Sequence, residues 1–237
     1  MKRSLVFFFS IIMALIFLGS SVGTAIRPQA DELEYVAAVG DSKDYEMLKY
    51  YTTEPEGNPK RFFSYTEFTK ADGSNVSITV TKGTEFSVEV TAINESLVYG
   101  QITLEGHILA ERIITIPYLS LATDVRFVME TTNNLTHWEQ EVTDRTDESD
   151  SNDWTKAWLD GNIFYLEDYA KHADNSIDHD KRGINYKTGW MEYYYDKATL
   201  SDGSVIYEME WKEVDLEIPT SGDEDSPGFE VVPFFIA

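Results

Sequence analysis

Carboxylates are the most abundant reactive groups of this chain, which has 42 Asp and Glu residues among 237. In the acidic run 144–153, oxygen donors recur at alternate positions as in calcium-binding loops, so Asp147, Asp150 and Asp153 are weak calcium candidates. Asp153 stands where the sharp turn of such a loop needs glycine, and Leu159 replaces the closing glutamate. A solvated acidic loop explains the run more simply, and no other cofactor is predicted.

No catalytic constellation is visible. A Gly-x-Ser-x-Gly pattern at 19–23 lies in an apolar N-terminal segment, without the strand-turn-helix context of a nucleophile elbow. The histidines do not have the spacing of a zinc site; they are His107, His137, His172 and His179. A glycosidase pair of carboxylates cannot be located from spacing, because the carboxyl separation is a property of the fold. We therefore predict no catalytic residue.

The 5 tryptophans would offer rings for stacking on sugars if they were exposed. Trp154 and Trp158 are four residues apart in a segment expected to be helical, where a shared face more often packs against a core. The others are Trp138, Trp190 and Trp211.

Most of the chain has the composition of β-strands, with 14% aromatic residues in segments rich in Val, Ile and Thr. Between residues 61 and 116, apolar and polar residues alternate between turns such as Asp72-Gly73, which predicts an antiparallel meander with one buried face. A second β section is expected at 185–212, with a turn at Asp202-Gly203. Aromatic residues on both faces of its first strand indicate a central position in a sheet.

Residues 134–160 do not show the period-two alternation of apolar and polar residues that marks the two β sections. Thr136 stands three residues before Glu139, which predicts a capped helix, and Asn152-Asp153 precedes a second short helical segment. The predicted fold class is therefore mainly β, an antiparallel sandwich or curled half-barrel, with a short helical insertion at about 134–160.

Residues 1–25 have the layout of a secretory signal peptide. Lys2 and Arg3 precede an apolar run at 5–18, and small residues follow up to Ala25, after which we expect cleavage. An uncleaved anchor is the alternative, but the run is shorter than the ~20 residues that cross a hydrocarbon core. No cysteine follows the run, which excludes a bacterial-type lipoprotein.

Asn-x-Ser/Thr sequons occur at Asn75, Asn94 and Asn134, near predicted turns where an oligosaccharide would be accessible. These glycosylation candidates agree with export.

The C-terminal residues 220–237 join an acidic stretch to an apolar run that is too short to span a bilayer. We interpret them as an acidic stalk and the start of a possible membrane anchor; the alternative is a docking segment that folds back on the domain. Residues 26–219 would then be a single β-rich ectodomain.

The formal net charge is −23 at pH 7. Such a field repels polyanions, so nucleic acid is not expected as a partner, whereas divalent cations and cationic surfaces would be attracted. Because the chain has no cysteine, its stability must come from packing and sheet hydrogen bonds.

Pro227-Gly228-Phe229 resembles the C-terminal sorting signals of archaeal surface proteins, in which this tripeptide opens a transmembrane anchor. The ectodomain is similar to the β-rich archaeal surface proteins of the choice-of-anchor type. That similarity is carried by Val39-Gly40-Asp41, Val80-Thr81-Lys82-Gly83-Thr84, Thr136-His137-Trp138-Glu139 and the segment 188–195. The resemblance implies an envelope location and no activity.

These features predict an extracellular, cell-surface module that is non-catalytic and acts as an envelope or ligand-binding (adhesion) domain. Its partners would be the envelope membrane, through the C-terminal tail, and a surface glycan, a protein or a small apolar ligand. Two alternatives stay open. One is a secreted polysaccharide hydrolase with an Asp/Glu pair beside exposed tryptophans, and the other is a carrier with an apolar cavity between the sheet and a helical lid.

Overall fold

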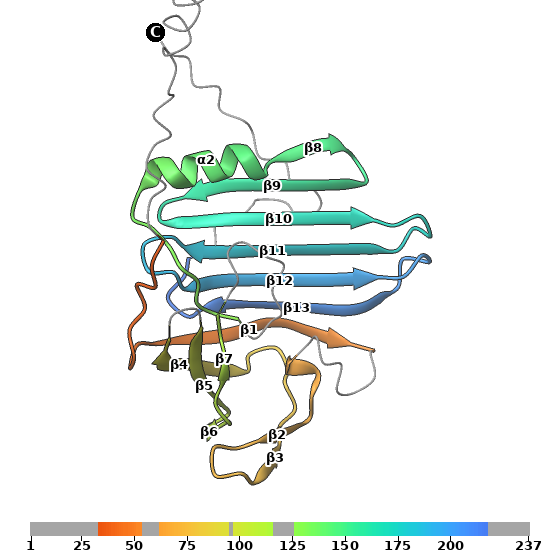
Figure 1. The fold of residues 1–237 in the computed structure, drawn as a ribbon. Coiled ribbons are helices and arrows are strands. Elements are labelled where there is room, and N and C mark those ends of the chain that lie inside the picture. The colour runs from red at the N-terminus through yellow and green to blue at the C-terminus, as the bar shows by residue number, and fades with distance from the viewer. Residues whose placement is uncertain (1–32, 54–61, 95–96, 116–125, 218–237) are drawn as a thin grey trace, which may run out of the picture.

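The computed structural model describes residues 33–53, 62–94, 97–115 and 126–217, most of which belong to one open β-sheet (Figure 1). This sheet has 11 strands in the order β6-β5-β4-β1-β13-β12-β11-β10-β9-β8, with β7 beside β5, and β2 pairs separately with β3. All of these strand pairs are antiparallel, as the sequence predicted.

In chain order, the elements are β1 (Ser42–Thr52), η1 (Phe62–Ser64), β2 (Glu67–Thr69), β3 (Asn75–Ser77), β4 (Glu85–Ile93), β5 (Val98–Leu104), β6 (His107–Ile108), β7 (Arg112–Ile113), α2 (Leu135–Arg145), β8 (Asp147–Asp150), β9 (Asp153–Asp160), β10 (Ile163–Lys171), β11 (Ile177–Asn185), β12 (Met191–Thr199) and β13 (Val205–Glu213).

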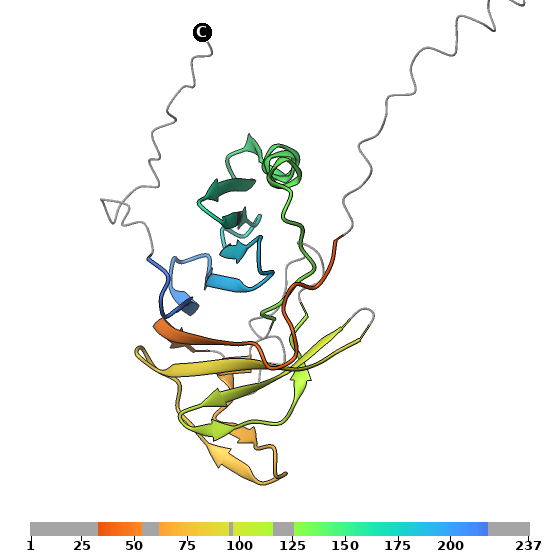
Figure 2. The same cartoon turned by 90° about the vertical axis from the view of Figure 1, so that its left-hand side faces the viewer.

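The sheet bends at β1. In Figure 2, strands β8 to β13 form an upright layer, and β4 to β7 turn away beneath β1. The sheet does not close into a barrel, and the predicted fold class, mainly β with a short helix, is confirmed. The predicted central position of the aromatic strand is also confirmed, because β12 lies between β11 and β13.

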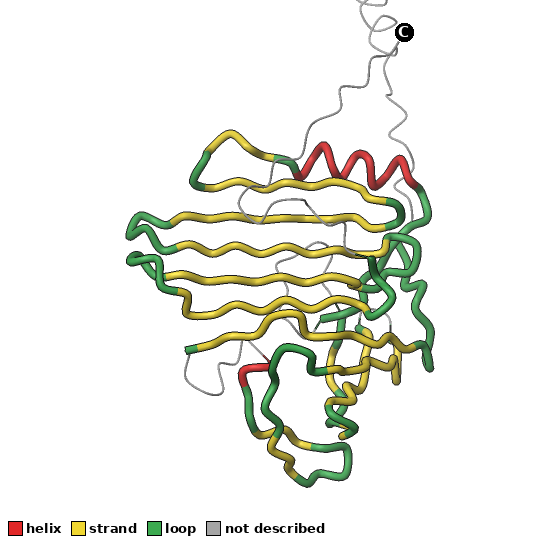
Figure 3. The backbone as a smooth tube through the Cα atoms, turned by 180° about the vertical axis from the view of Figure 1, so that it is seen from behind, coloured by secondary structure: helices red, strands yellow, loops and turns green. Residues whose placement is uncertain are grey.

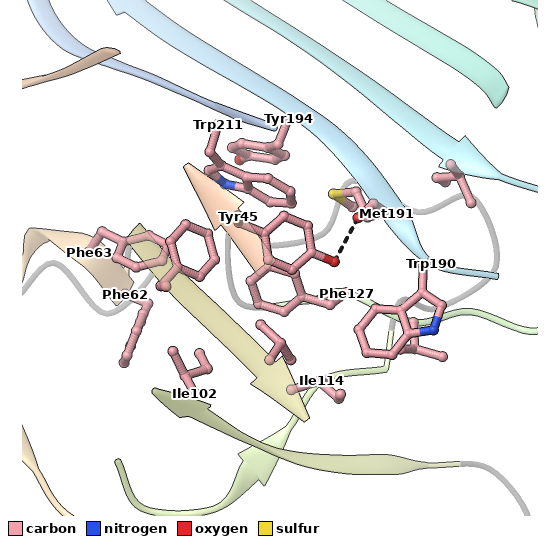
Figure 4. Close-up of a cluster of buried hydrophobic side chains, with 14 of the residues drawn as sticks. Tyr45, Phe62, Phe63, Ile102, Ile114, Phe127, Trp190, Met191, Tyr194 and Trp211 are labelled. Carbon is pink, nitrogen blue, oxygen red and sulfur yellow. Dashed lines mark hydrogen bonds between the residues drawn. The ribbon is translucent and has the colours of Figure 1, made fainter. Parts of the chain in front are cut away.

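The core lies inside the bend and is largely aromatic (Figure 4). Tyr45 of β1 stacks on Phe86 of β4 and meets Trp211 of β13 edge-on, with both pairs of ring centroids 5.1 Å apart. The ring centroid of Phe127 lies 5.3 Å from that of Tyr45. The Tyr45 hydroxyl donates a hydrogen bond to the Met191 carbonyl at 3.0 Å, so its buried polar atom is satisfied.

Helix α2 is attached to the sheet by one fully buried side chain. Trp138 lies 5.1 Å from Phe164 of β10 and 5.9 Å from Tyr186, measured between ring centroids. The helix begins after Asn134, whose Oδ1 accepts a hydrogen bond from the Thr136 amide at 3.0 Å. The predicted N-cap at Thr136 is therefore wrong.

The second predicted helix is also wrong, because Asp153–Asp160 form strand β9. Side chains four residues apart share a face in a strand as well as in a helix, so the spacing of Trp154 and Trp158 did not separate the two structures. Continuous pairing with β10 decides for the strand. The helical insertion therefore ends at Arg145, and residues 147–160 belong mainly to the sheet.

Several hairpin turns share an Asp-x-Ser sequence. The aspartate Oδ1 accepts the amide and the hydroxyl of the serine at 2.9 and 2.6 Å in the pairs Asp72–Ser74, Asp174–Ser176 and Asp202–Ser204. These bonds stabilise the ionised carboxylates and lower the pKa of each of the three. The turn at Asp174, which joins β10 to β11, was not predicted.

Candidate functional site

Strands β9 to β13 have one face that no described helix or strand covers. Figure 2 shows α2 on one side of these strands, and Figure 3 shows them from behind. Directly paired residues on neighbouring antiparallel strands point to the same side of a sheet. The pairing register therefore assigns the side chains of these strands to one face or the other.

We call the uncovered side the ring-and-lysine face, because its side chains form three rows that cross the strands. The first row is Trp154, Tyr169, His179, Lys197 and Glu208; the middle row is Lys156, Glu167, Lys181, Tyr195, Glu210 and Lys49; the third row is Trp158, Tyr165, Gly183, Tyr193 and Lys212. A mostly charged row thus lies between two rows that begin with aromatic rings.

Ring contacts order the first row. The rings of Trp154 and Tyr169 stack, with centroids 5.3 Å apart and an angle of 9° between their planes. His179 meets both of these rings edge-on, and its ring also lies 5.4 Å from that of Tyr195. The Nζ atom of Lys156 lies 5.0 Å from the Trp154 centroid. These side chains are half-buried, so the row is ordered and still reachable from solvent.

The third row is more deeply packed. Trp158 stacks on Tyr165 with centroids 5.1 Å apart, and Tyr165 and Tyr193 are both buried. The Nζ atom of Lys181, from the middle row, lies 4.9 Å from the Trp158 centroid and 5.4 and 5.6 Å from those of the two tyrosines. Burial under these rings lowers the pKa of Lys181, while neighbouring glutamates act in the opposite direction.

The carboxylates of the middle row are fixed by specific partners. An oxygen of Glu167 lies 2.8 Å from the Nε2 of His179, and Glu210 accepts a hydrogen bond from the Tyr193 hydroxyl at 2.9 Å. The other oxygen of Glu210 pairs with the Lys49 Nζ at 3.0 Å. The face therefore holds ammonium and carboxylate groups at ordered positions between the rings, and Glu167 among them is largely buried.

The opposite face of the same strands carries an aspartate row, Asp168, Asp180 and Asp196, paired directly across β10, β11 and β12. Burial raises the pKa of Asp180 to about 6, and the two flanking carboxylates add to this, whereas Arg182 opposes it. Arg182 is itself buried and donates a hydrogen bond from Nη2 to Asp180 at 2.7 Å. The Thr155 hydroxyl donates to Asp168 at 2.6 Å.

The calcium candidates lie at the edge of the sheet. Asp150 is opposite Asp153 across the β8–β9 turn, whereas Asp147 is opposite Thr155. Asp147 accepts a hydrogen bond from the backbone amide of Ser149, and Asp150 accepts one from the amide of Asn152. Within the described ranges, no three His, Asp or Glu side chains are grouped closely enough to hold a metal ion. The three calcium candidates therefore stay a weak prediction.

The three sequon asparagines are exposed. Asn75 lies on β3, Asn94 follows β4, and Asn134 caps α2 through its Oδ1. Their glycosylation stays a prediction. Of the tryptophans, Trp138, Trp190 and Trp211 are buried in the core, and Trp154 and Trp158 lie on the ring-and-lysine face.

Sequence reasoning missed most of this face because it assigned no strands to β10 and β11. The signal that was present is the alternation of Tyr165, Glu167 and Tyr169 in β10, a period-two pattern in which the outward residues are aromatic or charged. In β11 charged residues stand on both faces, so His179 and Lys181 gave no such signal.

The predicted signal peptide at 1–25 and the predicted stalk and anchor at 220–237 lie outside the described residues. Within the part of the chain that the structure describes, no helix is both long and apolar enough to cross a membrane. Comparisons of the chain with models of known protein families, with curated proteins and with solved structures found no match.

Proposed function

We propose that this protein is an exported, surface-tethered binding module without catalytic activity, and that the ring-and-lysine face is its binding surface. Export and tethering rest on the sequence features of residues 1–25 and 220–237. The choice of surface rests on one observation. Half-buried rings and ordered charges are arranged in rows on a sheet face that no described element covers.

Rings that are ordered before binding lose little conformational freedom when a ligand arrives, which favours recognition. Trp154 and Tyr169 are already stacked, and the side chains of Glu167 and His179 are already within hydrogen-bond distance. A surface built only for solubility would not need this internal order. The arrangement therefore supports a binding role for the face.

The hydrolase alternative has one observation in its favour, the pKa of about 6 for Asp180 next to Asp168 and Asp196. General acids of glycosidases have raised pKa values of this kind. However, Asp180 is paired with the buried Arg182, and the aromatic rows lie on the other face of the sheet. The rings and the aspartates therefore cannot act on one sugar chain, and binding is the preferred function.

The carrier alternative needs an apolar cavity between the sheet and the helix. At that position Trp138 is fully buried and packs against Phe164 and Tyr186. Side chains rather than a cavity thus fill the contact between α2 and the sheet. Nothing among the described residues favours an apolar ligand there.

The test measures binding of the labelled chain 26–237 to isolated cell envelopes of the producing organism. We expect saturable binding that falls roughly tenfold or more in the Trp154→Ala variant, because a ring contact worth ~1.4 kcal/mol is lost. The matched control is Tyr99→Ala, which removes a half-buried ring from β5, away from the face. Equal binding of all three proteins would contradict the proposal.

A further inference from the structure

The charges of the two faces of β9–β13 differ sharply in a chain whose net charge is −23. On the ring-and-lysine face, positive and negative side chains nearly balance; they are Lys156, Lys171, Lys181, Lys197 and Lys212 against Asp160, Glu167, Glu208 and Glu210. Charges separated by more than a Debye length of about 8 Å are largely screened at physiological salt, so a ligand on this face meets a nearly neutral surface.

Resting on the proposed function, we infer that the ligand of this face is a neutral, hydroxyl-rich glycan, bound at the first and middle rows around Trp154, Lys156 and Glu167. A sugar ring has an apolar face of C–H groups and an edge of hydroxyls. The Trp154–Tyr169 stack supplies aromatic surface for the former. Lysine donors and glutamate acceptors supply partners for the latter.

The alternating charges of the middle row suit hydroxyls in particular, because a hydroxyl both donates and accepts hydrogen bonds. Lys156, Glu167 and Lys181 are direct cross-strand neighbours, so donors and acceptors alternate at the spacing of the strands, about 4.8 Å. From β9 to β13 the row extends over about 20 Å, the length of a short oligosaccharide. The site therefore suits a chain that lies across the strands.

Charge complementarity argues against the other occupants. A polyanion gains little from a balanced face and is repelled by the acidic body of the protein. A polycation would be drawn to the exposed Asp147 and Asp150 of strand β8 rather than to a face that holds all the lysines of β9–β13. Glu148 of β8 already pairs with Lys156 of this face at 3.2 Å.

The experiment compares two soluble polysaccharides with the same β-1,4-glucan backbone, hydroxyethylcellulose without charge and carboxymethylcellulose with carboxylates, together with a neutral galactomannan. Binding to the chain 26–237 is measured by affinity electrophoresis and calorimetry. We expect binding of at least one neutral polymer, weaker or no binding of the carboxylated one, and an affinity that changes less than about twofold between about 0.05 and 0.5 M salt.

The variants locate the site. Trp154→Ala and Glu167→Gln should each weaken binding of the neutral polymer roughly tenfold. Trp154→Phe should retain most of it, and Tyr99→Ala and the exposed turn variant Lys82→Ala should leave it unchanged. Circular dichroism and thermal unfolding of each variant separate loss of the site from loss of the fold.

The outcomes separate this inference from the proposed function. Preference for the carboxylated polymer, or a steep loss of affinity with salt, would overturn the neutral-glycan inference. So would envelope binding that depends on Trp154 while no neutral polymer binds, although the proposed function would then stand. Release of reducing ends from any polymer, or dimers in light scattering that disappear in Trp154→Ala, would overturn both.

Discussion

The two faces of β9–β13 are built from alternate residues of the same five strands, and their chemistry is opposite. One face carries all the lysines of these strands, several glutamates and the stacked rings. The other carries every aspartate except Asp160, together with Arg182 and core residues such as Met209 and Trp211. The period of two in a strand allows neighbouring residues to serve two unrelated surfaces.

Side-chain length explains part of this division. Lysine has a long apolar stem that can pack against rings, and the Nζ atom of Lys181 lies against Trp158 and Tyr165. Aspartate is short, so its charge stays close to the sheet and to neighbouring strands. The short carboxylates of the aspartate row therefore depend on Arg182 and Thr155, whereas the outer charges partly neutralise one another.

The largest effect should come from two adjacent residues that point to opposite faces. Arg182→Met leaves the half-buried aspartate row without its buried cation, and removal of one partner from a buried ion pair costs about 3–5 kcal/mol. Lys181→Met keeps an apolar stem of similar length under the rings and removes a charge that burial already disfavours, so we expect a cost below about 1 kcal/mol. Denaturant unfolding at pH 7 measures both.

Acid should rescue only the first of these variants. Protonation of Asp180, whose pKa is about 6, removes the negative charge that Arg182 pairs with, so the cost of Arg182→Met should shrink at pH 4. If both variants lose equal stability at pH 7, the two faces do not differ in their electrostatic demands.

Part of this architecture could be predicted from the sequence, because it depends on the local alternation of apolar and polar residues. The β section expected at 185–212 contains β12 and nearly all of β13, and the aromatic residues on both sides of β12 correctly indicated a central position. From Tyr207 to Glu213 of β13, burial follows a period of two, and the Asp202-Gly203 turn lies between β12 and β13.

The candidate site was not accessible, because its rows exist only once the register is fixed. Strand β11 alternates charged residues on both faces, from Asp178 to Arg182, and has no apolar period that would mark it as a strand. Its conformation is set by pairing with β10 and β12. The contact of Trp154 with Tyr169 likewise depends on which residues face each other across two strands.

The second prediction concerns the aspartate row alone. The pKa of Asp180 is raised to about 6 in the folded protein from an ordinary value of 3.8, so the folded state binds this proton more tightly than the unfolded state. Protonated Asp180 therefore contributes about 3 kcal/mol to the free energy of unfolding below pH 4. This contribution is lost as the pH rises through about 6. Asp180→Asn should remove this part of the pH dependence.

The measurement is the free energy of unfolding of both proteins between pH 4 and pH 8. The difference between wild type and Asp180→Asn should move in favour of the variant as the pH rises, because only the wild type has to release the Asp180 proton. A difference that stays constant with pH would show that Asp180 is not held in a charge-disfavouring site.

The smallest of the three effects tests the packing of the ring-and-lysine face. A Cβ at Gly183 would lie 2.7 Å from Cε1 of Tyr165 and 3.1 Å from the Cβ of Tyr193, so the glycine leaves room for a ring over β11. Gly183→Ala should destabilise the protein by about 1–3 kcal/mol through overpacking. In a Tyr165→Ala background, the same change should cost clearly less, because the 2.7 Å contact is gone and only the 3.1 Å contacts with Ile163 and Tyr193 remain. Denaturant unfolding measures the cost in both backgrounds. An equal cost would mean that the rings on the ring-and-lysine face do not pack as one ordered unit. The contrast between this ordered face and the face with the aspartate row would then be wrong.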